Sequence, residues 1–186
     1  MENQKTKMLL HSCCGPCSSA VIMALKDDYD ITVLYYNPNI YPEEEYLHRK
    51  SEQIKLIESV NKEGENIKFL DCEYDPETYE RFVCGLENEK EGGARCTKCF
   101  WLRLEKTAKI AKQKGFDIFA TTLTVSPHKN APLINDIGTK ISNEVGVPYL
   151  VSDFKKKDGY KKSIELSKKY ELYRQKYCGC KFSIWW

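Results

Sequence analysis

Hydrophobic residues along the chain form short runs of strand length that alternate with longer segments of helical periodicity. Glycine, proline and other turn residues separate many of these segments. The pattern predicts strands over residues 7–11, 31–36, 67–72, 117–122 and 148–152. It predicts helices from residue 16 onward and over residues 42–60, 76–84, 97–114, 130–145 and 160–177, with a loop over residues 87–95.

This alternation indicates a single α/β domain over residues 1–186. Successive strand–helix units favour an open, mostly parallel, Rossmann-like sheet of about five strands with helices on both faces. Ligands of such sheets bind beyond the carboxyl ends of the strands, where the strand order reverses. We therefore expect the functional site in the loops that follow the first, fourth and fifth strands.

The composition excludes several classes of protein. The chain is 41% hydrophobic and 30% charged, which is typical of a globular domain. Its longest apolar runs have about five residues, whereas about 20 are needed to cross a bilayer. The first twelve residues do not resemble a secretory signal, so we expect a cytoplasmic protein that does not bind membranes. Because no glycine-rich phosphate-binding motif is present, we expect no nucleotide cofactor.

Nine cysteines are unusual in a chain long enough to fold around a hydrophobic core. Disulfides are rare in the cytosol, so clustered cysteines there indicate metal or redox chemistry. Cys72 and Cys84 stand alone, and we expect them to be buried and structural. The other seven form three groups, which are Cys13, Cys14 and Cys17, then Cys96 and Cys99, then Cys178 and Cys180.

The first two groups each place a Cys-x-x-Cys pair at the start of a predicted helix, where free N–H groups stabilise thiolates. Four such thiolates could hold a tetrahedral metal or an iron–sulfur cluster. A four-cysteine zinc site that binds RNA without catalysis is one alternative. A thioredoxin-like dithiol is another, because the segment Cys14-Gly-Pro-Cys17 matches that active-site tetrapeptide. Cys178-Gly-Cys180 could form a strained, redox-active disulfide, ligate metal or stay reduced.

The last third of the chain is strongly basic. Residues 155–181 hold ten basic and three acidic residues, with tyrosines between them. Such a segment could bind a polyanion and stack on unpaired bases, or it could simply be a solvent-exposed amphipathic helix. Asp153 and Asp158 flank its lysine run and could ligate a metal or deliver a proton, although Asp158 would equally suit a helix N-cap. His11 and His128 lie at predicted strand ends near the cysteines.

With these residues in place, the chain resembles the cobalamin-independent epoxyqueuosine reductases, the QueH family, nearly from end to end. The resemblance rests on many ordered motifs, and no cysteine of the pattern is missing. The motifs are His-Ser-Cys-Cys-Gly-Pro-Cys (11–17), Tyr-Asn-Pro-Asn (36–39), Arg-Cys-Thr-Lys-Cys (95–99), Leu-Thr-Val-Ser-Pro-His-Lys (123–129), Asp-Phe-Lys-Lys-Lys-Asp-Gly-Tyr (153–160) and Leu-Tyr-Arg-Gln-Lys-Tyr-Cys-Gly-Cys (172–180), followed by Phe182 and Ser183.

The resemblance implies a fold related to the nucleotide-α-hydrolase-like (HUP) Rossmann sheets. It implies reduction of the epoxide of epoxyqueuosine in tRNA to give queuosine, at the wobble position of the anticodon loop. It further implies a [4Fe-4S] cluster with an additional mononuclear iron. The partners would be tRNA and an external electron donor such as a ferredoxin or a flavodoxin.

The resemblance also implies roles for individual residues. Cys13, Cys14, Cys96 and Cys99 would hold the cluster, although Cys17 could replace Cys13 as a ligand. The basic segment of about residues 155–186 would pack near the cysteine site. Cys17 and Asp153 would bind the second iron, and the catalytic groups would be Cys178 and Cys180 with Cys17, Asp153 and Tyr160. The residues expected to bind substrate are His11, Asn37, Asn39, His128, Lys129, Lys155, Lys156, Lys157 and Arg174.

Overall fold

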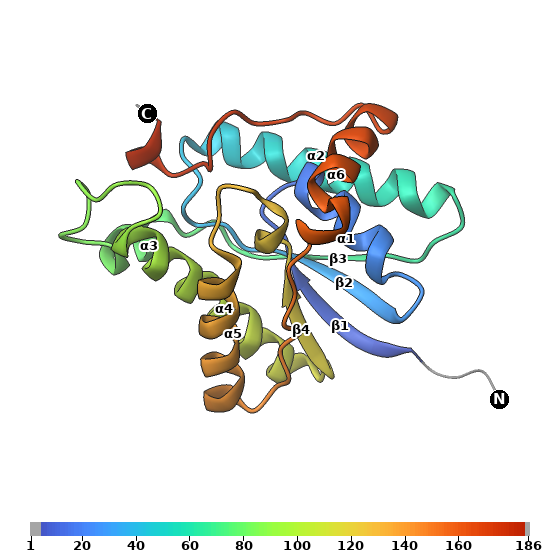
Figure 1. Ribbon diagram of the computed structural model, residues 1–186, viewed down its shortest axis with the longest axis horizontal. Coiled ribbons are helices and arrows are strands. Elements are labelled where there is room, and N and C mark those ends of the chain that lie inside the picture. The colour runs from blue at the N-terminus through green and yellow to red at the C-terminus, as the bar shows by residue number, and fades with distance from the viewer. Residues whose placement is uncertain (1–4, 185–186) are drawn as a thin grey trace.

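The computed structural model describes residues 5–184, and its centre is a parallel four-stranded sheet (Figure 1). The strand order is β3-β2-β1-β4, so the order reverses between β1 and β4. The α/β fold class and the parallel sheet are confirmed, but the sheet has four strands where about five were expected. The strands are β1 (Thr6–His11), β2 (Tyr29–Tyr35), β3 (Lys68–Asp71) and β4 (Ile118–Thr121).

The expected fifth strand, residues 148–152, is reduced to one parallel bridge between Tyr149 and Phe119. The N–H of Leu150 still donates to the carbonyl of Phe119 at 2.9 Å. The next backbone donor in line, the N–H of Ser152, instead bonds to the side chain of Asn135 at 3.2 Å. Because a helix side chain satisfies this backbone group, the segment leaves the sheet after a single bridge.

Helices cover both faces of the sheet (Figure 1). One face packs against α1 (Gly15–Leu25) and α2 (Glu43–Lys62), and the other against α4 (Ala94–Lys114) and α5 (Ala131–Val145). The alternation of side chains along β1 explains the two cores, since Met8 and Leu10 join the first and Leu9 joins the second. Strand order reverses after β3, and right-handed connections then place the later helices on the opposite face.

Two further helices complete the described part of the chain. The short α3 (Pro76–Phe82) packs against α4, and α6 (Gly159–Lys169) packs against α1. Short 3₁₀ turns lie at η1 (Leu123–Val125), η2 (Lys156–Asp158) and η3 (Lys181–Ser183). Within residues 5–184, no helix combines the length and apolar character needed to span a membrane.

The last helix is shorter than the predicted range of residues 160–177. Glu171 adopts a left-handed backbone with φ of 51°, and the N–H of Leu172 bonds back to the carbonyl of Ser167 at 2.8 Å, which closes the helix end. The N–H of Tyr173 then donates to the carboxylate of Glu52 on α2 at 2.7 Å. Residues 171–180, which we call the tail, consequently cross α2 as non-helical chain (Figure 1).

Candidate cysteine site

The first cysteine group forms where β1 passes into α1. The sulfur atoms of Cys13, Cys14 and Cys17 all lie within 4.8 Å of one another. Cys14 is the N-cap of α1 with an extended backbone, and α1 begins directly at Gly15. A Cβ on Gly15 would lie 3.0 Å from the carbonyl oxygen of Glu52, so glycine allows this helix start to sit against α2. Local backbone geometry therefore suffices to gather the three thiols.

The three thiols of this group differ in their electrostatic surroundings. Hydrogen bonds from Cys14 and Cys17 hold the pKa of Cys13 well below its usual range, and the charges of Lys129 and Arg103 lower it further. The same contacts with Cys13 raise the pKa values of Cys14 and Cys17. The surroundings therefore favour ionisation of Cys13 over ionisation of its two neighbours.

The other two cysteine groups together line a cavity of about 90 Å³ at the same edge of the sheet. Cys96 and Cys99 come from the first turns of α4, while Cys178 and Cys180 come from the end of the tail. Burial raises the pKa of Cys96, Cys178 and Cys99, the last to about 11. All nine cysteines lie within residues 5–184 and are free thiols.

Two cations join the cysteine groups. Arg103 of α4 is buried, and it donates to Cys99 Sγ at 3.7 Å and to Asn37 Oδ1 at 2.9 Å. Its charge also lowers the pKa of Cys13. The ammonium of Lys129 acts on Cys13 and on Cys178. Residues from three distant motifs therefore meet around two positive charges, which offset the negative charge of thiolates.

Arg49, which the sequence reasoning missed, fixes the tail to α2. It is buried, and its guanidinium donates to the carbonyls of Tyr177 at 3.1 Å and Cys178 at 3.2 Å. The carboxylate of Glu45 accepts its remaining Nε donor at 2.7 Å. The helical period offered a signal, because Arg49 lies on the buried stripe of α2 together with Tyr46, Gln53, Leu56 and Val60.

Gly179 lets the tail lie close to the loop that follows β2, at Ile40 and Tyr41. Its φ is 104°, and its carbonyl accepts the N–H of Tyr41 at 2.8 Å. A Cβ at this position would lie 2.8 Å from Ile40 Cγ1. On the neighbouring residue, Cys180 Sγ lies 3.1 Å from the hydroxyl of Tyr79 on α3. The glycine between the two cysteines is thus required by both backbone conformation and space.

A third buried arginine, Arg95, holds the loop before α4. It donates to the carbonyls of Leu86 at 3.2 Å and Glu87 at 3.0 Å, and also to the carbonyl of Glu89. Its other terminal nitrogen lies 3.4 Å from Ser183 Oγ in η3. Arg95 thereby connects the start of the Cys96–Cys99 turn with the residues that follow Cys180.

The structure places His11 and Asn37 beneath the cysteines. His11 Nε2–H donates to the carbonyl of Tyr36 at 3.0 Å, and Nδ1 accepts from Thr121 Oγ1 at 3.0 Å. This tautomer follows because the carbonyl of Tyr36 can only accept, so Nε2 carries the hydrogen of the neutral ring. Burial lowers the pKa of His11 to about 3, so the ring is neutral. Both side chains were expected to bind substrate, but both are buried and engaged by the protein.

Three other expected substrate residues do line the thiol cavity, namely Asn39, His128 and Lys129. Asn39 is buried, and within the described residues its Oδ1 atom has no hydrogen-bond partner. His128 is exposed and Lys129 is half-buried. A buried acceptor, an imidazole and an ammonium group therefore face a cavity that four thiols also line.

Asp153 and Tyr160 do not line that cavity. Asp153 lies in a separate groove between α6 and α1, with the ammonium of Lys156 at 3.9 Å. Tyr160 is exposed beneath the guanidinium of Arg174, which lies 5.7 Å from the ring centre. The structure thus brings neither residue into the group of cysteines, and their roles in iron binding and catalysis stay predictions.

The remaining basic residues also have defined positions. Arg174 donates to the carbonyl of Ser163 at 3.2 Å and to Ser167 Oγ at 3.0 Å, which binds the tail to α6. The ammonium of Lys155 donates to the carbonyl of Lys129 at 2.8 Å, so it supports the loop that lines the cavity. The side chain of Lys157 lies outside the described part of the chain.

The two isolated cysteines differ from each other. Cys72 is half-buried and packs against the core on the α4 side of the sheet. Cys84 is exposed, so the expectation that it is buried is wrong. It lies after the end of α3, in a turn where the chain leaves the core.

Fold and site together define an α/β protein with a parallel, Rossmann-like sheet and a cysteine-lined site beyond the carboxyl ends of its strands. A crystal structure described as a predicted subunit of tRNA methyltransferase from Methanocaldococcus jannaschii has a similar fold. The TM-score is 0.52 at 18% sequence identity, and the match covers 88% of this chain and 76% of that one. At this identity the similarity concerns the fold alone.

The chain belongs to the epoxyqueuosine reductase QueH family, whose model matches residues 8–185. A protein of that name from Staphylococcus epidermidis is 44% identical, over 98% of this chain and 78% of its own length. Another from Streptococcus pyogenes is 45% identical, over 98% of this chain and 72% of its own length. A third from Thermotoga maritima is 36% identical, over 95% of this chain and 90% of its own length.

Proposed function

We propose that this protein is an epoxyqueuosine reductase that acts on tRNA in the cytoplasm. The observation that carries the proposal is the meeting of seven cysteines from three distant motifs at one edge of the sheet, in a chain that belongs to this family. The reaction adds two electrons and two protons to the epoxide of epoxyqueuosine, and it yields the alkene of queuosine and one water molecule.

The cysteine site fits an iron–sulfur cofactor in its donor chemistry. Thiolates are the ligands that such clusters prefer, and the buried Arg103 offsets part of their negative charge. Cys13, Cys14, Cys96 and Cys99 would hold a [4Fe-4S] cluster. Cys17 Sγ lies within 4.8 Å of both other sulfur atoms, so its exchange with Cys13 stays open. The bound cluster would supply single electrons, and an additional iron would act as a Lewis acid.

Four residues are candidates for the additional iron and the redox step. Cys178 and Cys180 line the cavity and would serve as iron ligands or as a redox pair. Cys17 would contribute from the first group. Asp153 lies in the neighbouring groove, so its participation requires the loop after residue 152 to shift toward the cysteines.

The chain's own polar residues would position the substrate. The cavity volume of about 90 Å³ corresponds to about three water molecules in the liquid, so it would accept a small ring but not a nucleotide. A base in an anticodon loop is unpaired and can be turned out toward such a cavity. The ammonium of Lys129 would stabilise negative charge that develops on the epoxide oxygen, and Asn39 and His128 would orient the ring.

Lysines that precede α6 would contact phosphate groups of the tRNA. Lys155, Lys156 and Lys157 follow one another in the sequence, and Arg174 of the tail is held against α6 through the carbonyl of Ser163. Each phosphate contact of this type makes binding weaker as the salt concentration rises. A ferredoxin or a flavodoxin would supply the electrons.

The experiment is anaerobic purification, with iron, zinc and acid-labile sulfide counted per chain, followed by reaction with epoxyqueuosine-containing tRNA and dithionite. We expect about four or five irons, about four sulfides and conversion to queuosine. One zinc without sulfide and without conversion would contradict the proposal and favour the zinc module. Metal-free protein that reduces model disulfides would favour the thioredoxin-like alternative.

Single substitutions separate the two candidate ligand sets. Cys13→Ala should lose the cluster, while Cys17→Ala should retain sulfide. Cys84→Ala is the matched control, because Cys84 is exposed and distant from the other groups in the sequence. Full sulfide in Cys13→Ala together with its loss in Cys17→Ala would assign Cys17 as the ligand.

A further inference from the structure

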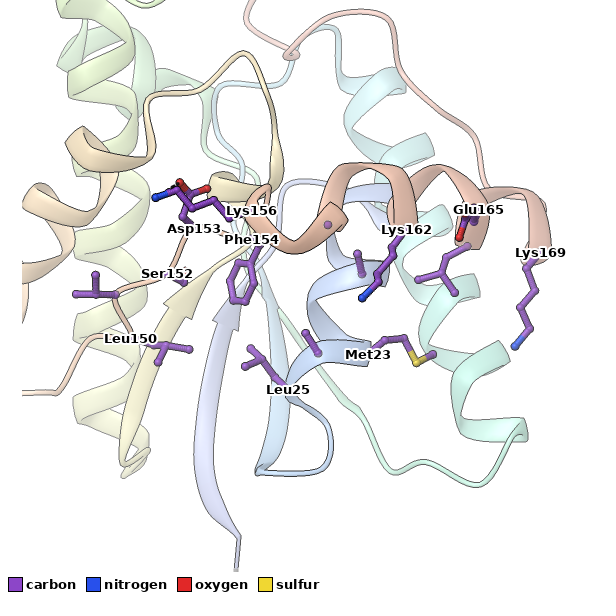
Figure 2. Close-up of a pocket in the computed structure, with 15 residues that line it drawn as sticks. Met23, Leu25, Leu150, Ser152, Asp153, Phe154, Lys156, Lys162, Glu165 and Lys169 are labelled. Atoms are coloured by element: carbon purple, nitrogen blue, oxygen red, sulfur yellow. Dashed lines mark ion pairs between the residues drawn. The ribbon is translucent and has the colours of Figure 1, made fainter.

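A groove of about 900 Å³ lies between α6, α1 and residues 150–154 (Figure 2). Its lining is mostly apolar. It shares no residue with the thiol cavity, so the cysteine chemistry does not account for it. The apolar side chains are Ala20, Met23, Ala24, Leu25, Leu150, Val151, Phe154 and Leu166.

The groove exists because the fifth strand is missing from the sheet. Residues 150–154 leave β4 after one bridge, and α6 packs on α1 instead of on this segment. Val151 is consequently 63% exposed. Where α6 begins, a Cβ on Gly159 would overlap the carbonyl oxygen of Phe154, so only glycine allows the helix start to pack against residues 150–154.

The groove approaches the thiols from the side of α1. Ala20 in its lining follows Cys17 by three residues on α1, a rise of about 4.5 Å along the helix axis. Cys17 also packs against the same hydrophobic cluster as Met23 and Phe154. A molecule in the groove would thus be separated from the first cysteine group by about one turn of helix.

The wall formed by α6 is basic. It carries Lys161, Lys162, Lys168 and Lys169 against a single acidic residue, Glu165. Lys162 and Lys169 line the groove beside Glu165 (Figure 2), and Lys156 and Asp153 lie at its far end. Lys169 and Lys156 pair with Glu63 and Asp153, whereas neither Lys162 nor Glu165 has an ion-pair partner among residues 5–184. Because α6 carries four lysines and one glutamate, the helix that forms this wall has a net positive charge.

An apolar lining with a basic wall fits a protein better than RNA. Phosphates and sugars gain little from contact with leucine, valine and methionine side chains, whereas the centre of a protein interface does. Complexes between electron-transfer proteins are small, and complementary charges guide their formation. The groove offers an apolar centre and positive charge on one side of the thiol site.

We propose that this groove docks a small acidic electron-carrier protein of the flavodoxin or ferredoxin class. The inference rests on the proposed function, which requires electrons from outside the chain. Each docked carrier gives up one electron and leaves oxidised. Two such events and two protons convert the epoxide into an alkene and water, and the electrons reach the cysteine site from the side of Cys17.

Binding of two probes tests the docking surface directly. Oxidised flavodoxin with its flavin bound and a [2Fe–2S] ferredoxin are titrated onto the anaerobically purified holoprotein by calorimetry at low salt. Lys162→Glu should raise the Kd of the probe that binds by about tenfold, and added salt should weaken binding of the unchanged protein. Lys161→Glu is the matched control, since Lys161 is exposed on the same helix but does not line the groove. Its Kd should change by less than about threefold.

A second variant probes the apolar lining. Val151→Asp introduces a negative charge at a well-exposed position, so it should weaken carrier binding at least as much as Lys162→Glu. The rate of cofactor reduction by the reduced carrier should fall in parallel in both variants. Reduction by dithionite, which needs no protein docking, should be unchanged.

Three outcomes would overturn the docking proposal. In the first, neither probe binds the unchanged protein. In the second, the Lys162→Glu and Lys161→Glu variants bind the carrier equally well. In the third, Lys162→Glu loses affinity for tRNA while it still binds the carrier. In each case, dithionite-driven conversion of epoxyqueuosine tRNA reports separately on the proposed function. If the unchanged protein does not convert epoxyqueuosine tRNA with dithionite, the proposed reductase function is itself contradicted.

Discussion

Cys13, Cys14 and Cys17 come together through one turn of backbone, whereas Cys178 and Cys180 reach the same edge of the sheet through contacts with distant residues. The first group is set by the end of β1 and the start of α1. The position of Cys178 and Cys180 depends on Arg49, Tyr79 and Ile40, which are about 100 residues or more away in the chain. One half of the site is therefore preformed locally, while the other half exists only when the tail is docked.

The largest effect is expected from substitution of Arg49, whose hydrogen bonds reach the tail and Glu45 rather than the Cys13–Cys17 turn. Arg49→Met removes the cation that pairs with Glu45 and the donor to two tail carbonyls, which should cost about 3–5 kcal/mol in the free energy of unfolding. Hydrogen exchange measured by mass spectrometry should accelerate in residues 171–180, while residues 11–17 stay protected. Lys50→Met, on the next residue of α2, is the control and should cost well under half as much. Equal exchange in both segments would show that the two halves form one cooperative unit.

Gly179 tests the tail without removing any charge. Gly179→Ala combines a left-handed backbone with a Cβ 2.8 Å from Ile40 Cγ1, so we expect a loss of about 2–3 kcal/mol. Gly85→Ala is matched to it, because Gly85 has φ of 84° and nothing within 4 Å of the added Cβ. The difference between the two in urea denaturation isolates the packing contribution. A difference near zero would mean that Ile40 moves away at no cost.

His11 gives the locally built half a pH dependence. The folded pKa of about 3 lies below the value of 6.5 for a free histidine, so the unfolded chain takes up the proton first as the pH falls. Stability is therefore fully present above about pH 6.5 and declines below it, by about 2 kcal/mol between pH 7 and pH 5. His11→Gln should flatten this part of the curve in urea titrations at each pH. An unchanged slope would assign the pH dependence to other groups.

Tyr79 provides the smallest and most local test. Tyr79→Phe removes only the hydroxyl beside Cys180 Sγ, so we expect a loss of about 1 kcal/mol. Alkylation of Cys180 by iodoacetamide, followed by mass spectrometry, should become faster, whereas alkylation of Cys13 should not change. Tyr74→Phe, which removes a hydroxyl bonded to the carbonyl of Ile40, controls for the loss of a phenol near the tail. Faster alkylation of Cys13 would mean that the two cysteine groups are coupled.

Local pattern was sufficient for most elements of the fold. The strand and helix signals of β1, β2, α2 and α5 were recovered within a few residues, because each combines apolar periodicity with clear turn or capping residues. The two misses were the fifth strand and the length of the last helix. In both, backbone groups bond to side chains of another element, Asn135 and Glu52, and such contacts leave no periodic trace in the sequence.

The sequence by itself determined the α/β class, the three cysteine motifs and the position of the first group, since these depend on neighbours within a few residues. Only the tertiary structure decided that Arg103 and Lys129 lie among all three motifs, that Arg49 fixes the tail, and that Asp153 faces a separate groove. Long-range packing and the cost of burying unpaired charge select those arrangements, and both depend on elements far apart in the chain.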